Sequence, residues 1–251
     1  MADGELPLAS DIDLAADLAR EAGALLLDLR ERSGLEGRAL GDEGDARANA
    51  LLVERLRAER PEDGLLSEES RDTCERQNKS RVWIIDPVDG TREYGEGRGD
   101  WAVHVALAVD GEAVLGAVAL PGLTGSPVMR SDSLPVAAPP AHTPRIVVSR
   151  SRPPAEAERA AQALRGELVP MGSAGAKAMA VVRGEAEAYL HSGGQHEWDS
   201  CAPVAVALGH GLHCSRIDGS PLRYNRAEPY LPDLLICRPE LAEPILAAIA
   251  D

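Results

Sequence analysis

The chain has 251 residues, of which 44% are hydrophobic and 27% are charged. These proportions are typical of a globular protein and exclude a disordered, collagen-like or fibrous chain. With 26 Lys and Arg residues against 41 Asp and Glu residues, the formal net charge is −15. We expect no nucleic-acid partner, because a protein that neutralises phosphates needs a basic face. The acidic excess instead suits divalent cations.

The amino-terminal segment and the cysteines indicate the cellular location of the protein. Met1-Ala-Asp-Gly-Glu-Leu6 is acidic and lacks the cationic and apolar regions of a signal peptide. No apolar run approaches the roughly 20 residues of a membrane helix. The four cysteines form no C-x-x-C pair, which favours reduced thiols. We therefore expect a cytoplasmic protein with no membrane partner.

The first half of the chain predicts two helices followed by an antiparallel sheet. Apolar residues from Ile12 to Leu29 recur at helical spacing, and Gly34 ends that helix. A second amphipathic helix is expected from about Ala46 to Arg60, before Pro61. Short apolar runs predict strands at residues 64–67, 81–85, 101–109 and 113–120. The dipeptide at positions 110–111, Asp-Gly, is a strong signal for a hairpin between the last two.

The second half of the chain predicts strands that alternate with helices. Residues 131–144 are rich in Pro and Ala and have no periodicity, so we expect two domains, at 1–135 and 136–251. Beyond this segment the alternation favours a layered α/β arrangement. The expected strands lie at 145–149, 167–171, 188–190, 212–216 and 233–237, and the expected helices at 154–164, 174–183, 200–210 and from 239 onward.

The segment Trp83-Ile-Ile-Asp-Pro-Val-Asp-Gly-Thr91 carries the clearest chemical signal. An apolar strand ends in Asp86 and Asp89, and Gly90 allows a tight reversal. Such a loop can turn both carboxylates and the carbonyl of Val88 toward one point, and these are hard oxygen ligands of the kind that Mg²⁺ takes. If Gly90 and Thr91 open a helix, their N–H groups form an anion site. The alternative is a purely structural turn.

Two further acidic segments become informative in combination. Glu68 and Glu69 follow an expected strand, and Asp199 opens an expected helix; alone, each is typical of a solvated pair or an N-cap. Two unit charges about 4 Å apart repel by roughly 4 kcal/mol at an effective dielectric constant of about 20. Several converging carboxylates would therefore need cations. Asp45, at the expected start of the second helix, is another candidate, with an N-cap role as the alternative.

These motifs together resemble a known family. Glu68-Glu69, the segment 86–91 and Trp198-Asp-Ser-Cys-Ala-Pro203 are similar in order and spacing to the inositol monophosphatase superfamily of Mg²⁺-dependent, lithium-sensitive phosphatases. Within it, Thr91-Arg-Glu-Tyr94 resembles the 3′-phosphoadenosine 5′-phosphate (PAP) phosphatase branch, and segments 149–152, 172–177 and 218–225 resemble its actinobacterial CysQ form. The resemblance implies an α+β fold, a layered αβαβα sandwich of the inositol monophosphatase and fructose-1,6-bisphosphatase type. It also implies a homodimer.

The resemblance assigns metal ligands to the acidic motifs. Glu68, Asp86 and the carbonyl of Val88 would hold one Mg²⁺, while Asp86, Asp89 and Asp199 would hold a second. Glu68 would also contact a third ion, so two or three Mg²⁺ are expected in each site.

The resemblance also assigns catalytic residues, while the sequence itself indicates side chains that could bind the substrate. Asp45, Glu68 and Thr91 would activate the attacking water. Lys177 is one of two lysines and suits a phosphate clamp, although a long side chain that reaches solvent is the alternative. The expected substrate-binding residues are Gly90, Thr91, Arg150, Ser173, Lys177 and Asp199.

The expected reaction is hydrolysis of the 3′-phosphate of PAP to AMP and phosphate. Inositol-1-monophosphatase and fructose-1,6-bisphosphatase activities are the alternatives within the family. A non-catalytic regulator that binds cations or nucleotides is the alternative from another class. The hydroxyl group of Thr91 argues against the regulator, because a pure binding protein has no use for a group that polarises water.

Overall fold

The computed structural model describes residues 8–135 and 141–250. The helices of this part are α1 (Leu8–Arg32), α2 (Gly37–Glu59), the short 3₁₀ helix η1 (Glu75–Asn78), α3 (Thr91–Gly95), α4 (Ala155–Leu164), α5 (Ala174–Val182), α6 (Glu197–Gly209) and α7 (Pro239–Ile249). The strands are β1 (Gly64–Ser67), β2 (Arg81–Asp89), β3 (Ala102–Val109), β4 (Glu112–Ala119), β5 (Val128–Arg130), β6 (Arg145–Ser149), β7 (Glu167–Met171), β8 (Ala188–Ser192), β9 (His213–Ser215) and β10 (Asp233–Cys237). In this part, no helix combines the length and apolarity that a membrane crossing requires.

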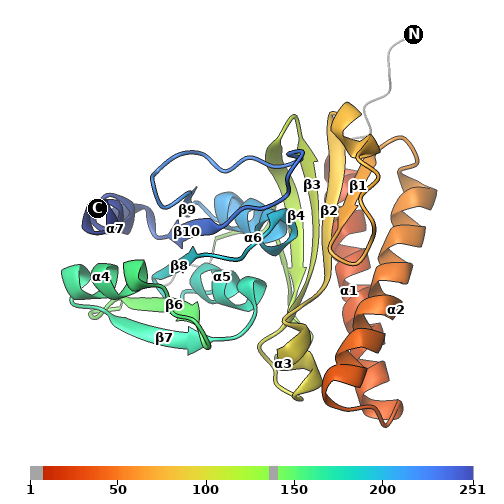
Figure 1. The fold of residues 1–251 in the computed structure, drawn as a ribbon, viewed down its shortest axis with the longest axis horizontal. Coiled ribbons are helices and arrows are strands. Elements are labelled where there is room, and N and C mark those ends of the chain that lie inside the picture. Colours follow the sequence, from red (N-terminus) through yellow and green to blue (C-terminus); the bar gives the residue numbers. More distant parts are fainter. Residues whose placement is uncertain (1–7, 136–140, 251) are drawn as a thin grey trace.

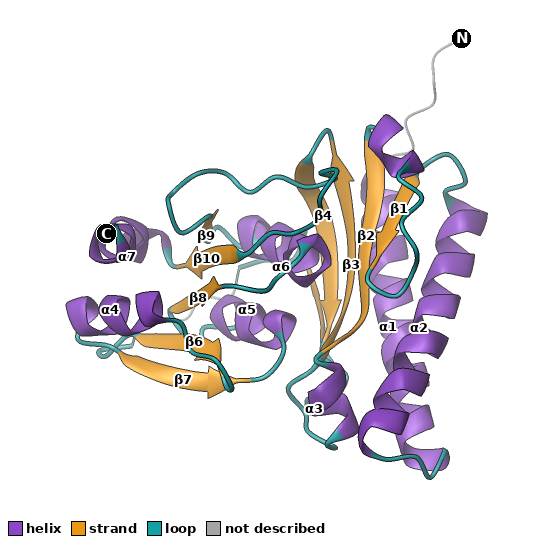
Figure 2. Cartoon of the chain, viewed as in Figure 1, coloured by secondary structure: helices purple, strands orange, loops and turns teal. Residues whose placement is uncertain are grey.

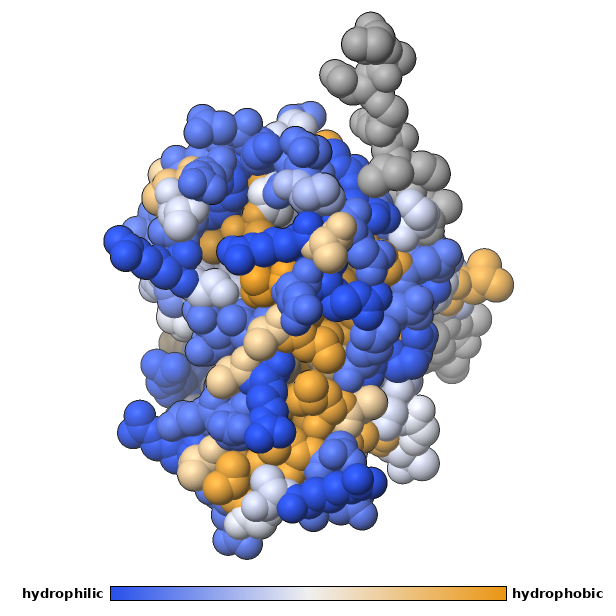
Figure 3. All heavy atoms as spheres, turned by 90° about the vertical axis from the view of Figure 1, so that its right-hand side faces the viewer, coloured by the Kyte–Doolittle hydropathy of each residue, from blue (hydrophilic) through white to orange (hydrophobic). Residues whose placement is uncertain are grey.

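The elements form five layers, which confirms the predicted αβαβα sandwich (Figure 1). Helices α1 and α2 cover one face of the sheet β1-β2-β3-β4-β5, and α5 and α6 separate it from the second sheet, β7-β6-β8-β10-β9 (Figure 2). Helices α4 and α7 pack together on the outer side of the second sheet. On the side of the molecule where α1 and α2 lie, hydrophilic residues surround a band of apolar ones (Figure 3).

Strand β2 is buried on both of its faces, and this explains its nearly continuous apolar sequence. Trp83 and Ile85 belong to the core that includes α1 and α2, whereas Val82 and Ile84 belong to the core that includes α5 and α6. Side chains alternate along a strand, so a run of large apolar residues fills both layers at once. The acidic end of β2 is thereby fixed between two packed cores.

The prediction of a wholly antiparallel first sheet is wrong for one pair of strands. β1 lies parallel to β2, with Gly64 opposite Val82 and Ser67 opposite Ile85. Parallel neighbours need a long crossover, and residues 68–80, which include η1, supply it. The remaining pairs are antiparallel, and the hairpin predicted at Asp110 joins β3 to β4. The crossover bears on the predicted metal site, because its first residue is Glu68, one of the expected ligands.

Helix α2 begins at Gly37, nine residues before the predicted start, so Asp45 lies well inside the helix and not at its N-cap. Two glycines that precede Asp45 in this first part of α2 allow close packing. A Cβ atom at Gly41 would lie 2.7 Å from Cγ2 of Thr91, and one at Gly44 would lie 2.8 Å from the ring of Tyr94. Glycine here lets α2 approach α3 closely, at a modest cost in helix propensity.

The two expected domains share a helical layer. The first sheet ends with β5 at Arg130 and the second begins with β6 at Arg145, but α6 packs on strands of both sheets. Part of the predicted boundary, residues 136–140, lies outside the described residues. The limits 1–135 and 136–251 remain a prediction.

Candidate active site and metal centre

Three carboxylates converge at the end of β2. Asp86 and Asp89 come from β2 and Asp199 from the first turn of α6, and their ligand oxygens all lie within 4.8 Å of one another. The pairing of β2 with β3 shifts register between Asp86 and Asp89. Pro87 has no N–H to give the ladder, and such an irregularity re-aims the side chains that flank it. The local sequence therefore turns both aspartates toward α6.

Glu68 joins this group from the end of β1. Its backbone N–H donates to the carbonyl of Ile85 at 3.4 Å, which places Glu68 beside the end of β2. Burial, and then the charge of Asp199, raise the pKa of Glu68 to about 8. Burial, and then the charge of Asp89, raise the pKa of Asp199 to about 7. Burial, followed by the charges of Glu68 and Asp89, also raises the pKa of Asp86 well above its ordinary value.

These shifts show that the carboxylates repel one another and have too few positive partners. A divalent cation would remove that repulsion, and carboxylate oxygens are its preferred ligands. The predicted ligands Glu68, Asp86, Asp89 and Asp199 thus fit a metal centre. The carbonyl of Val88 accepts a bond from Thr91 Oγ1 at 3.1 Å and keeps a second lone pair.

Asp89 differs from its neighbours because it is fully hydrogen-bonded. Its oxygens accept bonds from the Ser173 hydroxyl, from the backbone N–H of Ala174 at 3.0 Å, and from the N–H of Gly175. Burial alone would raise the pKa of Asp89, but His104 above all, and then the Ser173 hydroxyl and the charge of Lys177, lower it to about 2. The N–H groups at the beginning of α5 also point at this carboxylate, in agreement with a helix N-terminus favouring anions.

His104 is a site residue that the sequence prediction missed. It is fully buried on β3, directly opposite Asp86 in the sheet, and its Nε2 lies 3.1 Å from Oδ2 of Asp89. The available signal was that His104 interrupts the otherwise apolar run Trp101-Ala-Val-His-Val-Ala-Leu-Ala-Val109. A polar residue on a strand buried on both faces needs a polar partner.

Asp45 and Thr91 lie together, as the resemblance implied. Thr91 Oγ1 is 3.4 Å from Oδ1 of Asp45, and Thr91 begins α3 after Gly90, whose φ of +88° suits glycine. Burial, and then the charge of Glu69, raise the pKa of Asp45 to about 7. Gly90 is the N-cap of α3 and Thr91 is its first residue, so these two residues do open a helix.

In the structure, the expected substrate-binding side chains of Lys177 and Arg150 form hydrogen bonds with other groups of this chain. Lys177 is 5% exposed, and its Nζ donates to the carbonyl of Gly172 at 2.8 Å and to that of Ser173. Burial lowers the pKa of Lys177 to about 8. Arg150 donates to Glu93 at 2.7 Å and to Glu96 at 3.2 Å. Their contact with a substrate remains a prediction.

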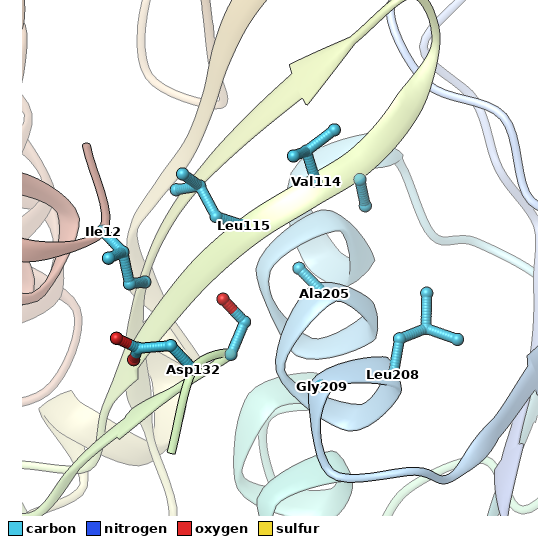
Figure 4. Close-up of a pocket in the computed structure, with 9 residues that line it drawn as sticks. Ile12, Val114, Leu115, Asp132, Ala205, Leu208 and Gly209 are labelled. Carbon is cyan, nitrogen blue, oxygen red and sulfur yellow. The ribbon is translucent and has the colours of Figure 1, made fainter. Parts of the chain in front are cut away.

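A separate hollow of about 370 Å³ lies between α1, β4 and α6 (Figure 4). Its lining is mostly apolar, with Asp132 as its one charged side chain, and includes none of the predicted site residues. An apolar wall with a single negative charge does not suit a phosphate ester. The acidic centre is the better candidate for the active site.

Comparison with known proteins agrees with this geometry. The model of the inositol monophosphatase family matches residues 9–250. The chain belongs to this family. The family is metal-dependent, and the acidic cluster gives this chain a group of residues that could hold a metal ion.

The relatives of this chain include proteins of the PAP phosphatase branch. The chain is 54% identical to the Mycobacterium leprae protein named 3′-phosphoadenosine 5′-phosphate phosphatase, over 96% of this chain and 94% of that one. It is 31% identical to the Escherichia coli K12 3′(2′),5′-bisphosphate nucleotidase CysQ, over 74% and 80% of the two chains. The predicted similarity to CysQ-type proteins in their actinobacterial form is confirmed.

Solved structures share the fold. CysQ from Bacteroides thetaiotaomicron matches with a TM-score of 0.76 and 24% identity, covering 91% of this chain and 97% of that one. The inositol monophosphatase from Anabaena matches with a TM-score of 0.76 and 22% identity, covering 97% and 96%. These matches confirm the fold class.

Proposed function

We propose that the protein is a Mg²⁺-dependent phosphatase that hydrolyses the 3′-phosphate of PAP to give AMP and phosphate. The observation that carries this proposal is the 54% identity, over nearly the full length of both chains, with a protein named for PAP hydrolysis. The buried carboxylate cluster supports it, because a phosphate ester can approach so many negative charges only when cations neutralise them.

Glu68, Asp86, Asp89, Asp199 and the carbonyl of Val88 would hold two or three Mg²⁺ ions. When bound, Mg²⁺ supplies positive charge for the scissile phosphate and lowers the pKa of a water molecule. The protein's own contribution is to orient the ligands and, for Asp89, also to keep the carboxylate ionised. Asp89 shows this best, since three hydrogen-bond donors fix both of its oxygens.

Asp45 and Thr91 would orient the attacking water. The Thr91 hydroxyl has one proton, for which the carboxylate of Asp45 and the carbonyl of Val88 are both acceptors. When Asp45 accepts that proton, the hydroxyl oxygen can accept a hydrogen bond from water and draw its proton away from the attacking oxygen. Glu68 lies in the same group of interacting charges and would hold the water from the other side.

The leaving group and the second phosphate of PAP would lie toward Gly90, Arg150, Ser173 and Lys177. The N–H groups at the start of α3 would face the scissile phosphate. Lys177 would balance the 5′-phosphate, the second anion of PAP. The cytoplasmic location and the homodimer are further parts of this proposal.

A substrate panel tests the proposal. Phosphate release would be measured with PAP, inositol 1-phosphate and fructose 1,6-bisphosphate, each with and without Mg²⁺. We expect the highest kcat/KM with PAP and no release when EDTA removes the ions. A preference for inositol 1-phosphate or fructose 1,6-bisphosphate would overturn the substrate assignment. Mg²⁺ binding without any release of phosphate would indicate a non-catalytic regulator.

A further inference from the structure

A buried arginine ties the crossover that carries Glu68 to the carboxy-terminal half of the chain. Arg76, in η1, is 2% exposed. Its guanidinium group donates to Oδ1 of Asn225 at 2.8 Å, to the carbonyl of Arg226 at 3.0 Å, and to Asp72 of its own segment at 2.7 Å. A planar group with several donors in a fixed geometry is needed to satisfy all of these acceptors together.

Asn225 connects Arg76 on one side to Glu197 on the other. Its side-chain amide donates to the carbonyl of Arg76 at 3.2 Å, and its backbone has a φ of +57°, a conformation that asparagine tolerates well. The backbone N–H groups of Asn225 and Arg226 donate to the two oxygens of Glu197 at 2.6 and 2.8 Å. Glu197 is fully buried in the first turn of α6.

Each end of this connection belongs to a segment that carries a predicted metal ligand. Arg76 belongs to the same crossover, residues 68–80, that begins with Glu68, and Glu197 is two residues before Asp199. Glu68 and Asp199 come from different halves of the chain and repel each other. Without a tie, that repulsion would favour their separation.

We propose that Arg76, Asn225 and Glu197 are positioning residues that hold Glu68 at the distance from Asp199 that a cation requires. We call these three residues the interdomain clasp. The inference rests on the proposed metal centre and adds residues that touch neither ion nor substrate. Side chains that orient metal ligands typically change metal affinity by about 10- to 100-fold when they are replaced.

Substrate-free calorimetry with Mg²⁺ tests the clasp. Arg76→Lys keeps the positive charge but loses the forked geometry, and Asn225→Ala removes the side-chain bonds between Asn225 and Arg76. Arg145→Lys is the matched control, because Arg145 also makes several bonds to a buried carboxylate, that of Glu187, but within one half of the chain. Thermal unfolding of each metal-free variant reports the accompanying loss of stability.

We expect Arg76→Lys and Asn225→Ala each to weaken Mg²⁺ binding about 10-fold, and the double variant to bind no more weakly than either single one. Arg145→Lys should lower the melting temperature and leave Mg²⁺ affinity unchanged. Unchanged affinity in the clasp variants, with the same loss of stability, would overturn the inference and leave the metal centre intact. A parent protein that binds no Mg²⁺ would instead contradict the metal centre, and the inference with it.

Discussion

The two ring nitrogens of His104 connect Asp89 to the backbone of α6. Nε2 lies 3.1 Å from Oδ2 of Asp89, and Nδ1 lies 3.0 Å from the carbonyl oxygen of Trp198. Asp89 is negatively charged and the carbonyl oxygen of Trp198 is an acceptor, so a doubly protonated, positively charged ring would suit both neighbours. Burial opposes this charge, but Asp89 outweighs it and raises the pKa of His104. His104 thus links β3 to β2 and to α6 beside the predicted metal ligands.

We predict that His104→Ala lowers the free energy of unfolding by about 3–5 kcal/mol near pH 6, because it leaves the buried carboxylate of Asp89 without its charge partner. A group whose pKa is raised by folding stabilises the protein fully below its unfolded pKa, and this contribution is lost as the pH rises through the folded pKa. The difference between parent and variant should therefore shrink toward pH 9.

Urea unfolding in EDTA at several pH values measures this effect. His210→Ala is the control for the loss of a buried imidazole, since His210 is also buried and its Nε2 lies 3.2 Å from a backbone carbonyl, that of Arg130. A loss for His104→Ala that stays constant from pH 6 to pH 9 would argue for lost packing alone.

We predict that Asp89→Asn and Asp199→Asn each reduce kcat with PAP by at least about 100-fold at saturating Mg²⁺, since each removes several kcal/mol of charge stabilisation and preserves shape. Asp233→Asn is the control, because Asp233 is a buried carboxylate whose partner, Arg216, lies away from the centre. Steady-state phosphate release measures all three. Near-parental turnover in either site variant would remove that residue from the ligand set.

Local sequence was sufficient to predict the acidic end of β2. Asp86, Asp89 and Gly90 follow a strongly apolar strand, and both the strand and its terminating turn depend on neighbouring residues. The five layers could be predicted as well, with the help of the family resemblance. Strand and helix periodicities differ clearly in most of this chain.

Features set by distant contacts could not be predicted in this way. Gly41 and Gly44 disfavour a helix locally, and their role in α2 becomes clear only from the close packing of Thr91 and Tyr94 against them. Equally, nothing in the sequence near Arg76 indicates Asn225, because 149 positions separate the two residues. Tertiary packing overrides local propensity at such places.

We predict that Thr91→Val lowers kcat by about 100- to 10,000-fold, because it removes the hydroxyl that orients water and nearly preserves the side-chain shape. Thr91→Ser should restore most of the activity, since it keeps Oγ1 and loses only the methyl group that faces Gly41. Phosphate release and circular dichroism of both variants provide the comparison. If Ser and Val variants were equally inactive, the packing of α2 on α3 would matter more than the hydroxyl.

We predict that Lys177→Ala reduces kcat/KM with PAP by roughly 10- to 150-fold, which corresponds to about 1.5–3 kcal/mol for one charge-assisted contact. The effect on 3′-AMP should be small, because this nucleotide lacks the 5′-phosphate. Lys79→Ala, at the exposed second lysine, is the control. Equal losses with both nucleotides would show that Lys177 acts by holding the carbonyls of Gly172 and Ser173, the contacts it makes in the structure.

The most direct test is to identify the nucleotide product formed from PAP. The purified protein would be incubated with PAP and Mg²⁺, and the products would be separated by ion-pair chromatography while released phosphate is measured in parallel. The account predicts 5′-AMP and phosphate in equal amounts, with neither formed in EDTA or by Asp89→Asn. Formation of 3′-AMP, or PAP left unchanged at saturating Mg²⁺, would contradict it.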